Sequence, residues 1–557
     1  TKVTTRRVCY VQTNLLALHK SLADDFAKFC AVNSGTLPIL FQSDVGHFTA
    51  PGLTQTDTDI RTDLPGYNVI ENGQVSRAAK DMMEFEEFLN DFVFFYKGCS
   101  FSFDRALLAA GVPLRNLEQN CSVSLFVTNV KCHPVGPFKC QMGVSLRPIP
   151  RDLVETACKV THPLTDFHGA PVHIGDPGLI GIDDISKPDY MDPMTFEEGD
   201  VPVFWGCGIT VVDAIKAANA TLAFSHHPGC MYISDTILPQ NQDTSSADIC
   251  VVTLYEQPYW ASLTSKSVVQ QIEQLDGFVA EESVGHNDRL AASDNLLKSV
   301  LTLSHASSVA VTTGSLNNSR RRIDGVPGAI AVAMMLQALG KKVDLVVDEM
   351  LYAPLIAVLD ALEKQKVLST PISVVHFPPD GEKDDLETAE RFLLGDGSAG
   401  PRYDHLLGIW SAEHAENHVV SAVNRLFLAA ANIPRVHTSG IVYGMGKVEN
   451  ILRGPSFDFH LTAGVSNWGS YAVAIALYLV STCPIHERYR RRALGFPPSE
   501  DDRERFRVAL PNADREEQVM RTMASHDLFD ITEKDLQHVK DVHAKKIEQL
   551  LSIIGEK

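Results

Sequence analysis

The sequence is short of three features that mark common classes of protein: clustered cysteines, long apolar runs and positive charge. Its 11 cysteines among 557 residues include no C-x-x-C pair, which indicates free thiols in a reducing compartment instead of a disulfide scaffold. The most apolar window covers only residues 471–480, whereas a membrane span needs about 20 apolar residues, so we expect no membrane partner. The formal net charge of −20 opposes binding to nucleic acid or to anionic membranes.

What the sequence does contain is typical of a large globular protein. Hydrophobic residues make up 45% and charged residues 21% of the chain. A chain of 557 residues is too long for a single core, so two or more domains are expected. The first nine residues, TKVTTRRVC, carry two arginines but are too short for a complete transit peptide, so they leave the localisation open.

One stretch, residues 309–349, has the pattern of a strand, a helix and a second strand. Val309–Thr313 and Val343–Val347 are β-branched runs typical of buried strands, and Asp324–Gly328 opens an apolar helix between them. The N-terminus of such a helix favours an anion. The unit contains neither G-x-G-x-x-G nor G-x-x-x-x-G-K-[ST], so it signals no dinucleotide or nucleoside triphosphate and identifies no cofactor. An ordinary structural unit is the alternative.

The pattern of the chain changes near its middle. The first half has short apolar runs bounded by Gly, Pro or Asn, which predict an α/β or α+β domain, with one helix expected at Met82–Tyr96. After Ser267, longer helical patterns alternate with Val-rich strands, which predicts a doubly wound, mostly parallel α/β domain. The expected boundaries are a first domain at residues 1–238, a polar linker at 239–262 and a second domain at 263–557.

Several polar clusters flanked by glycine or proline stand out in the first domain, at residues 98–103, 147–148, 168–175, 206–210 and 226–229. They contain four histidines, His168, His173, His226 and His227. These residue types suit either a metal site or an acid/base pair, although a single histidine is more often structural. Cys99 and Cys207 suit nucleophiles at turns, but buried structural thiols are the alternative that we prefer.

Together with DIRTDLP at residues 59–65, these clusters resemble the hydro-lyase family of bacterial proteins in order and spacing, over about residues 10–235. The resemblance implies a hydro-lyase-like domain at the N-terminus. Hydro-lyase chemistry requires a base, an acid for the departing hydroxyl group and a clamp for the substrate carboxylate. We expect His173 or His226 to transfer the protons and Arg147 to bind the carboxylate.

Two glycine-rich helix openings and one lysine stand out in the second domain. Asp324–Gly328 has a counterpart in Ala463–Gly469. There Ser466 and Asn467 are side-chain donors, and Gly444–Lys447 adds a turn with a cation. Two anion-accepting helix ends and a lysine suit a small dicarboxylate or an amino acid. The alternative is that these turns only close the fold.

The segments DGVPGAIAVAMMLQALGKKVDLVVDE, GMGKV and AGVSNWG resemble the vertebrate-type D-glutamate cyclase family, and the order of the two domains matches this family along nearly the whole chain. The resemblance implies an enzyme, a carbon–oxygen lyase that converts D-glutamate to 5-oxo-D-proline and water. It also implies a small-molecule partner, D-glutamate, and a location in the mitochondrial matrix.

Roles for the second-domain residues follow from the demands of ring closure, which needs a base, an oxyanion stabiliser and donors to the carboxylates. We expect Asp324 to act as the base and Lys447 to hold the oxyanion or the α-carboxylate. Ser466 and Asn467 then contact the other carboxylate oxygens. Further substrate contacts are expected from Thr313, Gly314, Gly325 and Gly328.

Three loops of the second domain are shorter than in that family: the loop before Gly444, the segment Trp410–His418 and the stretch His526–Ile531. A catalytically impaired homologue that binds an acidic amino acid or a protein partner is therefore the alternative function. The amphipathic helix predicted after Thr532 either packs on its own domain or pairs with a second copy, so the chain can also form a homo-oligomer.

Overall fold

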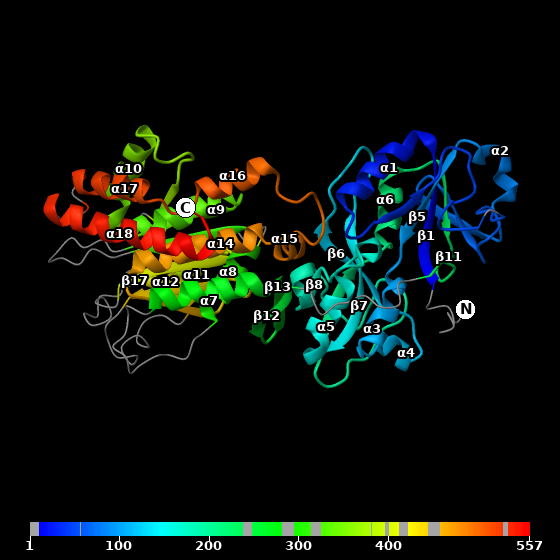
Figure 1. Cartoon of the computed structure of the whole chain (residues 1–557), viewed down its shortest axis with the longest axis horizontal. Helices are drawn as coiled ribbons and strands as arrows, with labels where there is room; N and C mark the ends of the chain where they lie inside the picture. Colours follow the sequence, from blue (N-terminus) through cyan, green and yellow to red (C-terminus); the bar gives the residue numbers. More distant parts are fainter. Residues whose placement is uncertain are drawn as a thin grey trace. The chain divides into compact units, whose positions relative to one another are not determined.

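The chain folds into two compact units, each with its own core (Figure 1). Unit 1 comprises Thr1–Leu263 and Ile485–Pro497, and unit 2 comprises Thr264–Pro484 and Pro498–Lys557. Unit 1 therefore contains a short segment from the C-terminal part of the chain. The computed structural model describes residues 10–55, 57–237, 248–280, 294–313, 325–379, 381–395, 400–411, 422–443, 457–526, 528 and 533–556.

Unit 1 contains two sheets built from antiparallel pairs. The seven-stranded sheet has the order β2-β5-β1-β10-β3-β4, with β11 paired to β1, and the six-stranded sheet has the order β12-β13-β8-β9-β7-β6. The strands are β1 (Tyr10–His19), β2 (Ile39–Gln42), β3 (Tyr67–Glu71), β4 (Gln74–Ala79), β5 (Phe92–Gly98), β6 (Leu125–Lys131), β7 (Gln141–Pro150), β8 (His173–Gly175), β9 (Asp200–Gly206), β10 (Leu222–His226), β11 (Tyr232–Ile237), β12 (Ile249–Glu256) and β13 (Tyr259–Ser265).

Helices cover these sheets and fill the core between them. The helix α1 (Lys20–Val32) buries Ala23, Phe26, Phe29 and Cys30, whose spacing of three and four residues places them on one face. This face packs against alternate residues of β1 and β5. The remaining helices of unit 1 are α2 (Glu86–Leu89), α3 (Asp104–Ala109), α4 (Arg115–Glu118), α5 (Val154–Thr161), α6 (Thr210–Ala218) and most of α15 (Pro484–Arg490).

Two expectations for unit 1 are corrected by the structure. Residues 82–96 form no long helix, because FVFFY belongs to β5, which is buried on both faces and therefore lacks the alternation that marks a strand. Of the expected linker at 239–262, residues 239–247 lie outside the described residues, whereas residues 249–262 contain β12 and most of β13. The strand β13 extends the six-stranded sheet by pairing Ala261 with Ile174 of β8. Apolar residues of both segments are part of the core, which a solvent-exposed linker would not be.

Unit 2 is built on a six-stranded parallel sheet with the order β16-β15-β14-β17-β18-β19. From the centre of the sheet, β14, β15 and β16 follow one another toward one edge, and β17, β18 and β19 follow one another toward the other edge. The switch point therefore lies between β14 and β17. This confirms the predicted doubly wound α/β architecture. The strands are β14 (Ser308–Thr313), β15 (Lys342–Val347), β16 (Ser373–His376), β17 (His405–Ser411), β18 (His437–Tyr443) and β19 (Phe459–Ala463).

Two apolar helices at the centre of unit 2, α9 (Val326–Ala338) and α14 (Ser466–Thr482), lie side by side (Figure 1). Gly328 permits this approach, because a Cβ atom there would lie 2.6 Å from the side chain of Ser470. The C-terminal helix α18 packs on α7, α14 and α17 of its own unit. The other helices are α7 (Lys266–Ala280), α8 (Asn295–His305), α10 (Glu349–Lys364), α11 (Leu386–Leu394), α12 (Asn424–Ala430), α16 (Glu500–Val508), α17 (Ala513–Ser525) and α18 (Glu533–Ile554).

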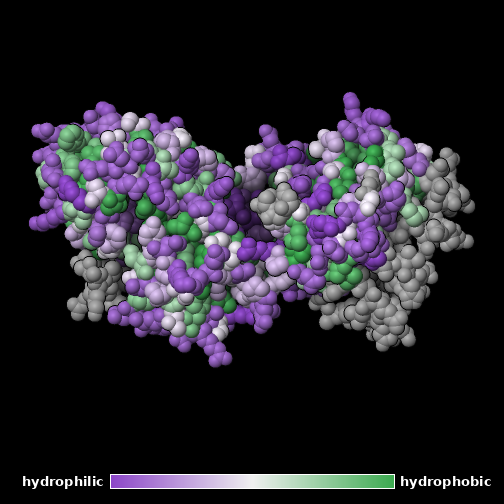
Figure 2. All heavy atoms as spheres, turned by 180° about the vertical axis from the view of Figure 1, so that it is seen from behind, coloured by the Kyte–Doolittle hydropathy of each residue, from purple (hydrophilic) through white to green (hydrophobic). Residues whose placement is uncertain are grey.

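The surface that Figure 2 draws is mostly hydrophilic, with hydrophobic residues scattered over it. Within the described ranges, no single helix is long and apolar enough to cross a membrane.

Candidate functional site

The ammonium group of Lys97 is an unusual feature of the core of unit 1. Lys97 follows the apolar run of β5 and is fully buried, and its Nζ has no hydrogen-bond partner among the described residues. The ring centroid of Phe26 lies 6.0 Å from Nζ. Burial lowers the pKa of Lys97 from 10.5 to about 8, and the thiols of Cys30 and Cys207 act in the opposite direction. A buried cation without a partner is costly, so this group points to a bound anion.

A second buried cation, Arg147 of β7, is held by Asp104. Its Nε donates to Oδ1 of Asp104 at 3.0 Å and its Nη1 donates to Oγ of Ser145 at 3.1 Å. Its Nη2 lies 2.8 Å from the same Asp104 oxygen, but no acceptor in the described part of the chain meets it in hydrogen-bond geometry. The rings of Phe103 and Trp205 lie 4.5 and 5.6 Å from the guanidinium carbon. Arg147 is thus fixed in place with donors left for another acceptor.

The imidazole of His168 is buried close to both cations. His168 has a left-handed backbone (φ 77°), and its Nδ1–H donates to the carbonyl oxygen of Gly35 at 3.1 Å. Its Nε2 therefore carries the lone pair, and this atom has no partner within the described residues. Burial lowers the pKa of His168 to about 4. The hydrogen bond to Gly35 opposes this shift, whereas the positive charges of Arg147, Arg488 and Lys97 add to it.

Close backbone contacts bring the segments that carry these groups together. The pairing of β1 with β5 sets Asn14 opposite Lys97, and Nδ2 of Asn14 donates to the carbonyl of Gly98 at 3.0 Å. A Cβ atom on Gly98 would lie 1.8 Å from the carbonyl oxygen of Asp166, and one on Gly208 would lie 2.6 Å from Nδ2 of Asn14. Glycine at both positions therefore permits the approach. Four of the sequence clusters converge here, at residues 98–103, 147–148, 168–175 and 206–210.

The two cysteines of these clusters are thiols, not thiolates. Burial raises the pKa of Cys99 to about 12 and also raises the pKa of Cys207. A thiol with a raised pKa is a poor nucleophile. The structure thus supports the interpretation of both as structural cysteines.

The other two histidines expected in this site have different surroundings. His173 lies in β8, where its Nε2–H donates to the carbonyl of Asp176 at 2.7 Å and its Nδ1 accepts from Arg492 at 3.3 Å. Both ring nitrogens are therefore used within the protein, and burial lowers the pKa of His173 to about 3. In His226 of β10, Nδ1–H donates to the carbonyl of Leu15 at 3.4 Å, and burial, together with the charge of Lys97, lowers the pKa of His226 to about 4.

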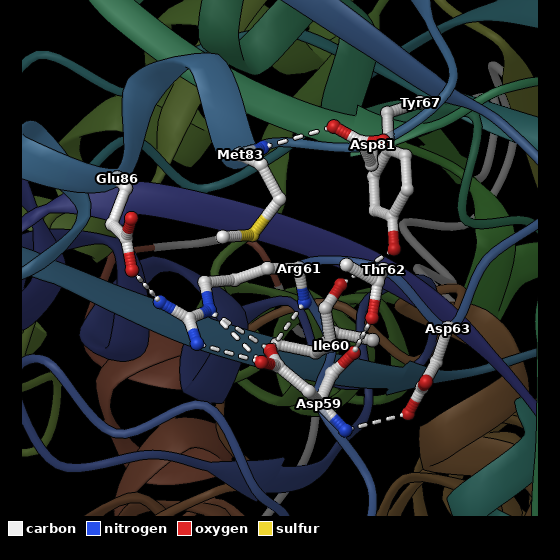
Figure 3. Close-up of polar contacts among 9 residues, drawn as sticks. All are labelled: Asp59, Ile60, Arg61, Thr62, Asp63, Tyr67, Asp81, Met83 and Glu86. Atoms are coloured by element: carbon white, nitrogen blue, oxygen red, sulfur yellow. Dashed lines mark hydrogen bonds and ion pairs between the residues drawn. The ribbon is translucent and has the colours of Figure 1, made fainter.

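The polar groups of the DIRTDLP segment form hydrogen bonds with one another and with nearby residues (Figure 3). Arg61 points toward two carboxylates, donating to Asp59 at 2.7 Å and to Glu86 at 3.2 Å, and its hydrogen bonds lower the pKa of Asp59. The backbone N–H of Asp59 donates to Asp63 at 2.7 Å, and the hydroxyl of Tyr67 donates to a backbone carbonyl of the same loop at 2.6 Å. These bonds assign the segment a structural role, with Arg61 already paired.

In unit 2 the structure brings together the residues expected at the two helix openings. Oδ1 of Asn467 accepts from the backbone N–H of Gly328 at 3.0 Å, so these two residues bind each other. Gly325 (φ 100°) begins α9 directly against Thr313, because a Cβ atom there would lie 2.6 Å from the Thr313 hydroxyl. The hydroxyl of Ser466 is buried without a partner in the described ranges. Three further predicted site residues, Gly314, Asp324 and Lys447, lie outside the described residues.

The cluster of Lys97, Arg147 and His168 suits one class of ligand. Two buried cations with unused donors favour a small acid with carboxylate groups, and the neutral imidazole can accept a proton from it. The metal alternative finds no support in the described part of the chain, where no three His, Cys, Asp or Glu side chains gather in a group that could hold an ion.

Sequence reasoning missed Lys97 and did not select His168. The signal for Lys97 was present, since a lysine closes an apolar run and directly precedes the glycine of residues 98–103. It was missed because the run was assigned to a helix, where a lysine at the end is unremarkable. For His168, spacing alone could not separate one histidine from its neighbours.

Two family models match the chain. The model described as "D-glutamate cyclase" matches residues 93–235, and the model described as "D-glutamate cyclase-like, C-terminal" matches residues 275–552. Lys97, Arg147 and His168 all lie in the first of these regions.

Curated relatives match either the whole chain or its N-terminal region. The mitochondrial D-glutamate cyclase of Homo sapiens is 32% identical over 591 residues, which cover 97% of this chain and 93% of the relative. The "Putative hydro-lyase" of Clostridium beijerinckii is 44% identical over 227 residues, 41% of this chain and 86% of that relative. The "Putative hydro-lyase YcsI" of Bacillus subtilis is 41% identical over 226 residues, 41% of this chain and 87% of the relative. These bacterial relatives match the N-terminal region.

Proposed function

Because the chain belongs to the D-glutamate cyclase family, a family of lyases, we propose that it converts D-glutamate to 5-oxo-D-proline and water. The observation that carries this proposal is the buried cluster of Lys97, Arg147 and His168. D-Glutamate has two carboxylates and one ammonium group, and the cluster offers two cations and one lone-pair nitrogen. Their charges are complementary.

Ring closure moves protons within the substrate. The amine nitrogen forms a bond to the γ-carbon, one C–O bond of the γ-carboxyl group breaks, and that oxygen leaves as water. Two protons pass from the nitrogen to the departing oxygen, so no net proton is exchanged with the solvent. Because both reacting groups belong to one molecule, positioning supplies much of the rate, with effective molarities of about 10⁵ M or more.

Each member of the cluster has a role in this sequence. Arg147 binds a carboxylate with its unused donors. Nε2 of His168 accepts a proton from the substrate ammonium, which frees the amine to attack. The ammonium of Lys97 stabilises the oxyanion that forms on the γ-carboxyl group and passes one proton to the departing oxygen, while the protonated His168 passes the other. The second proton of the attacking nitrogen then returns to Lys97, so both side chains end in the state in which they began. A bound anion offsets the nearby cations, which raises the pKa of His168 toward its usual range and makes it a stronger base.

The residues predicted in unit 2 form a second candidate site. Asp324 as the base and Lys447 at the oxyanion remain predictions, and Ser466 offers an unused hydroxyl. Oδ1 of Asn467 accepts from the Gly328 N–H, which leaves its Nδ2–H groups to donate as predicted. We favour unit 1 as the location of the chemistry because its two buried cations have donors without a partner in the described part of the chain.

By the name of the human relative we also propose a mitochondrial location for this chain, in the matrix. Subcellular fractionation against matrix and cytosolic marker proteins tests this proposal. The predicted homo-oligomer is tested separately, by light scattering after size-exclusion chromatography, where a single-copy mass would count against it.

The activity is tested by incubating the purified full-length protein with D-glutamate or L-glutamate and measuring 5-oxoproline by chiral chromatography and mass spectrometry. We expect the D-lactam to form from D-glutamate far faster than in the protein-free control. Calorimetric binding of D-glutamate without any product would support the alternative of a catalytically impaired homologue. If D-glutamate neither binds nor reacts, the proposed function is wrong.

A further inference from the structure

A short segment from the C-terminal part of the chain completes unit 1. Residues Ile485–Pro497, which we call the strap, are flanked on both sides by residues of unit 2 but belong to unit 1. The bacterial relatives match the N-terminal region, so the strap lies outside the part of the chain that they share with this protein.

The strap binds the backbone on both sides of His168. Arg488 donates from Nη2 to the carbonyl of His168 at 2.6 Å and from Nη1 to the carbonyl of Ala170 at 3.2 Å. Arg492 donates to the carbonyl of Val172 at 3.0 Å. Three alternate carbonyls of the segment 168–172 are therefore held by guanidinium groups of the strap.

The strap also holds the backbone of Gly35, whose carbonyl oxygen binds the His168 ring. The backbone N–H of Gly35 donates to the carbonyl of Ala493 at 3.1 Å, and the carbonyl of the same Gly35 accepts from Nδ1 of His168 at 3.1 Å. Gly35 is thus a bridge between the strap and the imidazole. Because the Gly35 carbonyl requires a proton on Nδ1, this bridge keeps the lone pair on Nε2.

Two glycines leave room for strap atoms. A Cβ atom on Gly169 would lie 2.7 Å from Nη2 of Arg488, and one on Gly35 would lie 2.2 Å from the Cβ atom of Ala493. Gly169 in addition has a left-handed backbone, with φ of 67°. A side chain at either glycine would displace the strap. Glycine at these two positions therefore permits the close contact between the strap and the segments that carry Gly35 and Gly169.

We propose that the strap is a positioning element of the unit 1 site and that Arg488 is the positioning residue for His168. This inference rests on the proposed function. Arg488 acts on the backbone of His168, and the Ala493–Gly35 contact acts on its ring. Without the strap the imidazole loses its fixed orientation and its burial, whereas Arg147 keeps its own support from Asp104. The strap therefore governs the proton-transfer step and not the binding of the substrate carboxylate.

The test compares Arg488→Gln and Arg488→Lys with the matched control Arg490→Gln in the full-length protein. Arg490 lies in the strap but takes no part in the contacts above. We expect Arg488→Gln to lower kcat for lactam formation by about 10- to 100-fold with KM changed by less than about threefold. Arg488→Lys keeps the charge but cannot span two carbonyls, so its kcat should be intermediate. The control should match the wild type.

A second readout does not depend on activity. The exchange of the imidazole C2 proton with deuterium, followed by mass spectrometry across pH, gives the pKa of His168 itself. The groups that face this ring are Arg147, Lys97 and Arg488. Loss of Arg488 removes a cation and admits water, and both changes raise the pKa of His168 from about 4 toward 6.5. In Arg490→Gln it should stay low.

The outcomes separate the two proposals. If the wild type forms no lactam, the proposed function fails. The titration of His168 alone then decides whether the strap positions its ring. If Arg488→Gln leaves both kcat and the pKa of His168 unchanged, the strap has no positioning role. If Arg488→Gln raises KM and leaves kcat unchanged, the strap serves substrate binding and the inference is wrong. Should Arg488→Gln fail to fold, Arg488→Lys carries the same two measurements.

Discussion

Replacement of Lys97 by methionine should stabilise unit 1 while removing its activity. Burial lowers the pKa of Lys97 from 10.5 to about 8. A shift of this size corresponds to about 3 kcal/mol of unfavourable free energy for the charged form in the folded protein. Methionine has a similar length and carries no charge, so Lys97→Met relieves this cost. A gain of about 1–3 kcal/mol at neutral pH is expected after relaxation of the site.

The gain has a defined dependence on pH. Because the folded-state pKa of Lys97 is lower than the unfolded-state value, the unfolded chain binds more protons between pH 8 and 10.5. The stability of the wild type relative to Lys97→Met therefore rises through this window. The difference between the two proteins should be full below pH 8 and should vanish near pH 10.5.

The assay is urea unfolding at several pH values between 7 and 10.5, with amide hydrogen exchange of the β1 and β5 peptides reporting on unit 1 alone. Lys187→Met is the matched control, since the Lys187 side chain is 81% exposed. It should leave the urea midpoint of these peptides unchanged. A Lys97→Met protein that is less stable than the wild type at pH 7, or a difference that does not change with pH, would refute the reasoning that the ammonium is buried without a partner.

Three further substitutions and one control test other parts of the structure. Arg147→Lys keeps the charge but loses the planar fork, so kcat/KM for D-glutamate should fall by about 100-fold, mainly through KM, in the lactam assay. Asn467→Ala removes the acceptor of the Gly328 N–H, so urea unfolding of unit 2 should show a loss of about 1–2 kcal/mol, and no loss would contradict the bond. Gly98→Ala would place a Cβ atom 1.8 Å from a backbone carbonyl, so the protein should fail to accumulate in the soluble fraction. Gly277→Ala in α7 meets nothing within 4 Å, so the same substitution there should be tolerated.

The architecture of unit 2 could be predicted from the sequence because its signals are local. Strands such as Val343–Val347 are Val-rich runs, and the helices between them are long, so the alternation is visible without any contact information. The family resemblance was equally accessible, since it depends on the order of short motifs. Both predictions are confirmed by the sheet order and by the relatives.

The first half of the chain was harder because β5, the strand that carries Lys97, is buried along its whole length. The run Phe92–Tyr96 has no period of two, and only its pairing with β1 and β2 makes it a strand. The same applies to β13, which is buried along most of its length and pairs with β8, far earlier in the sequence, whereas β12 pairs with its neighbour β13. Pairing between strands that are far apart in the sequence produces no local sequence pattern.

The site of unit 1 could be predicted only in part for a related reason. Arg147 was identified from its motif, but the choice among the histidines depended on which ring nitrogens the fold uses. Both ring nitrogens of His173 form hydrogen bonds within the protein, whereas Nε2 of His168 has no partner among the described residues. The strap was not predicted at all, because its carbonyl partners at residues 168–172 precede it by about 320 residues.

Our proposal places the chemistry in the cluster of unit 1. It is tested most directly by the initial rate of 5-oxo-D-proline formation from D-glutamate, measured side by side for Lys97→Met and Asp324→Asn in the full-length protein. We expect a loss of at least about 100-fold in Lys97→Met and a rate within about threefold of the wild type in Asp324→Asn. The reverse pattern, with Lys97→Met active and Asp324→Asn inactive, would place the reaction in unit 2 and exclude the cluster of unit 1.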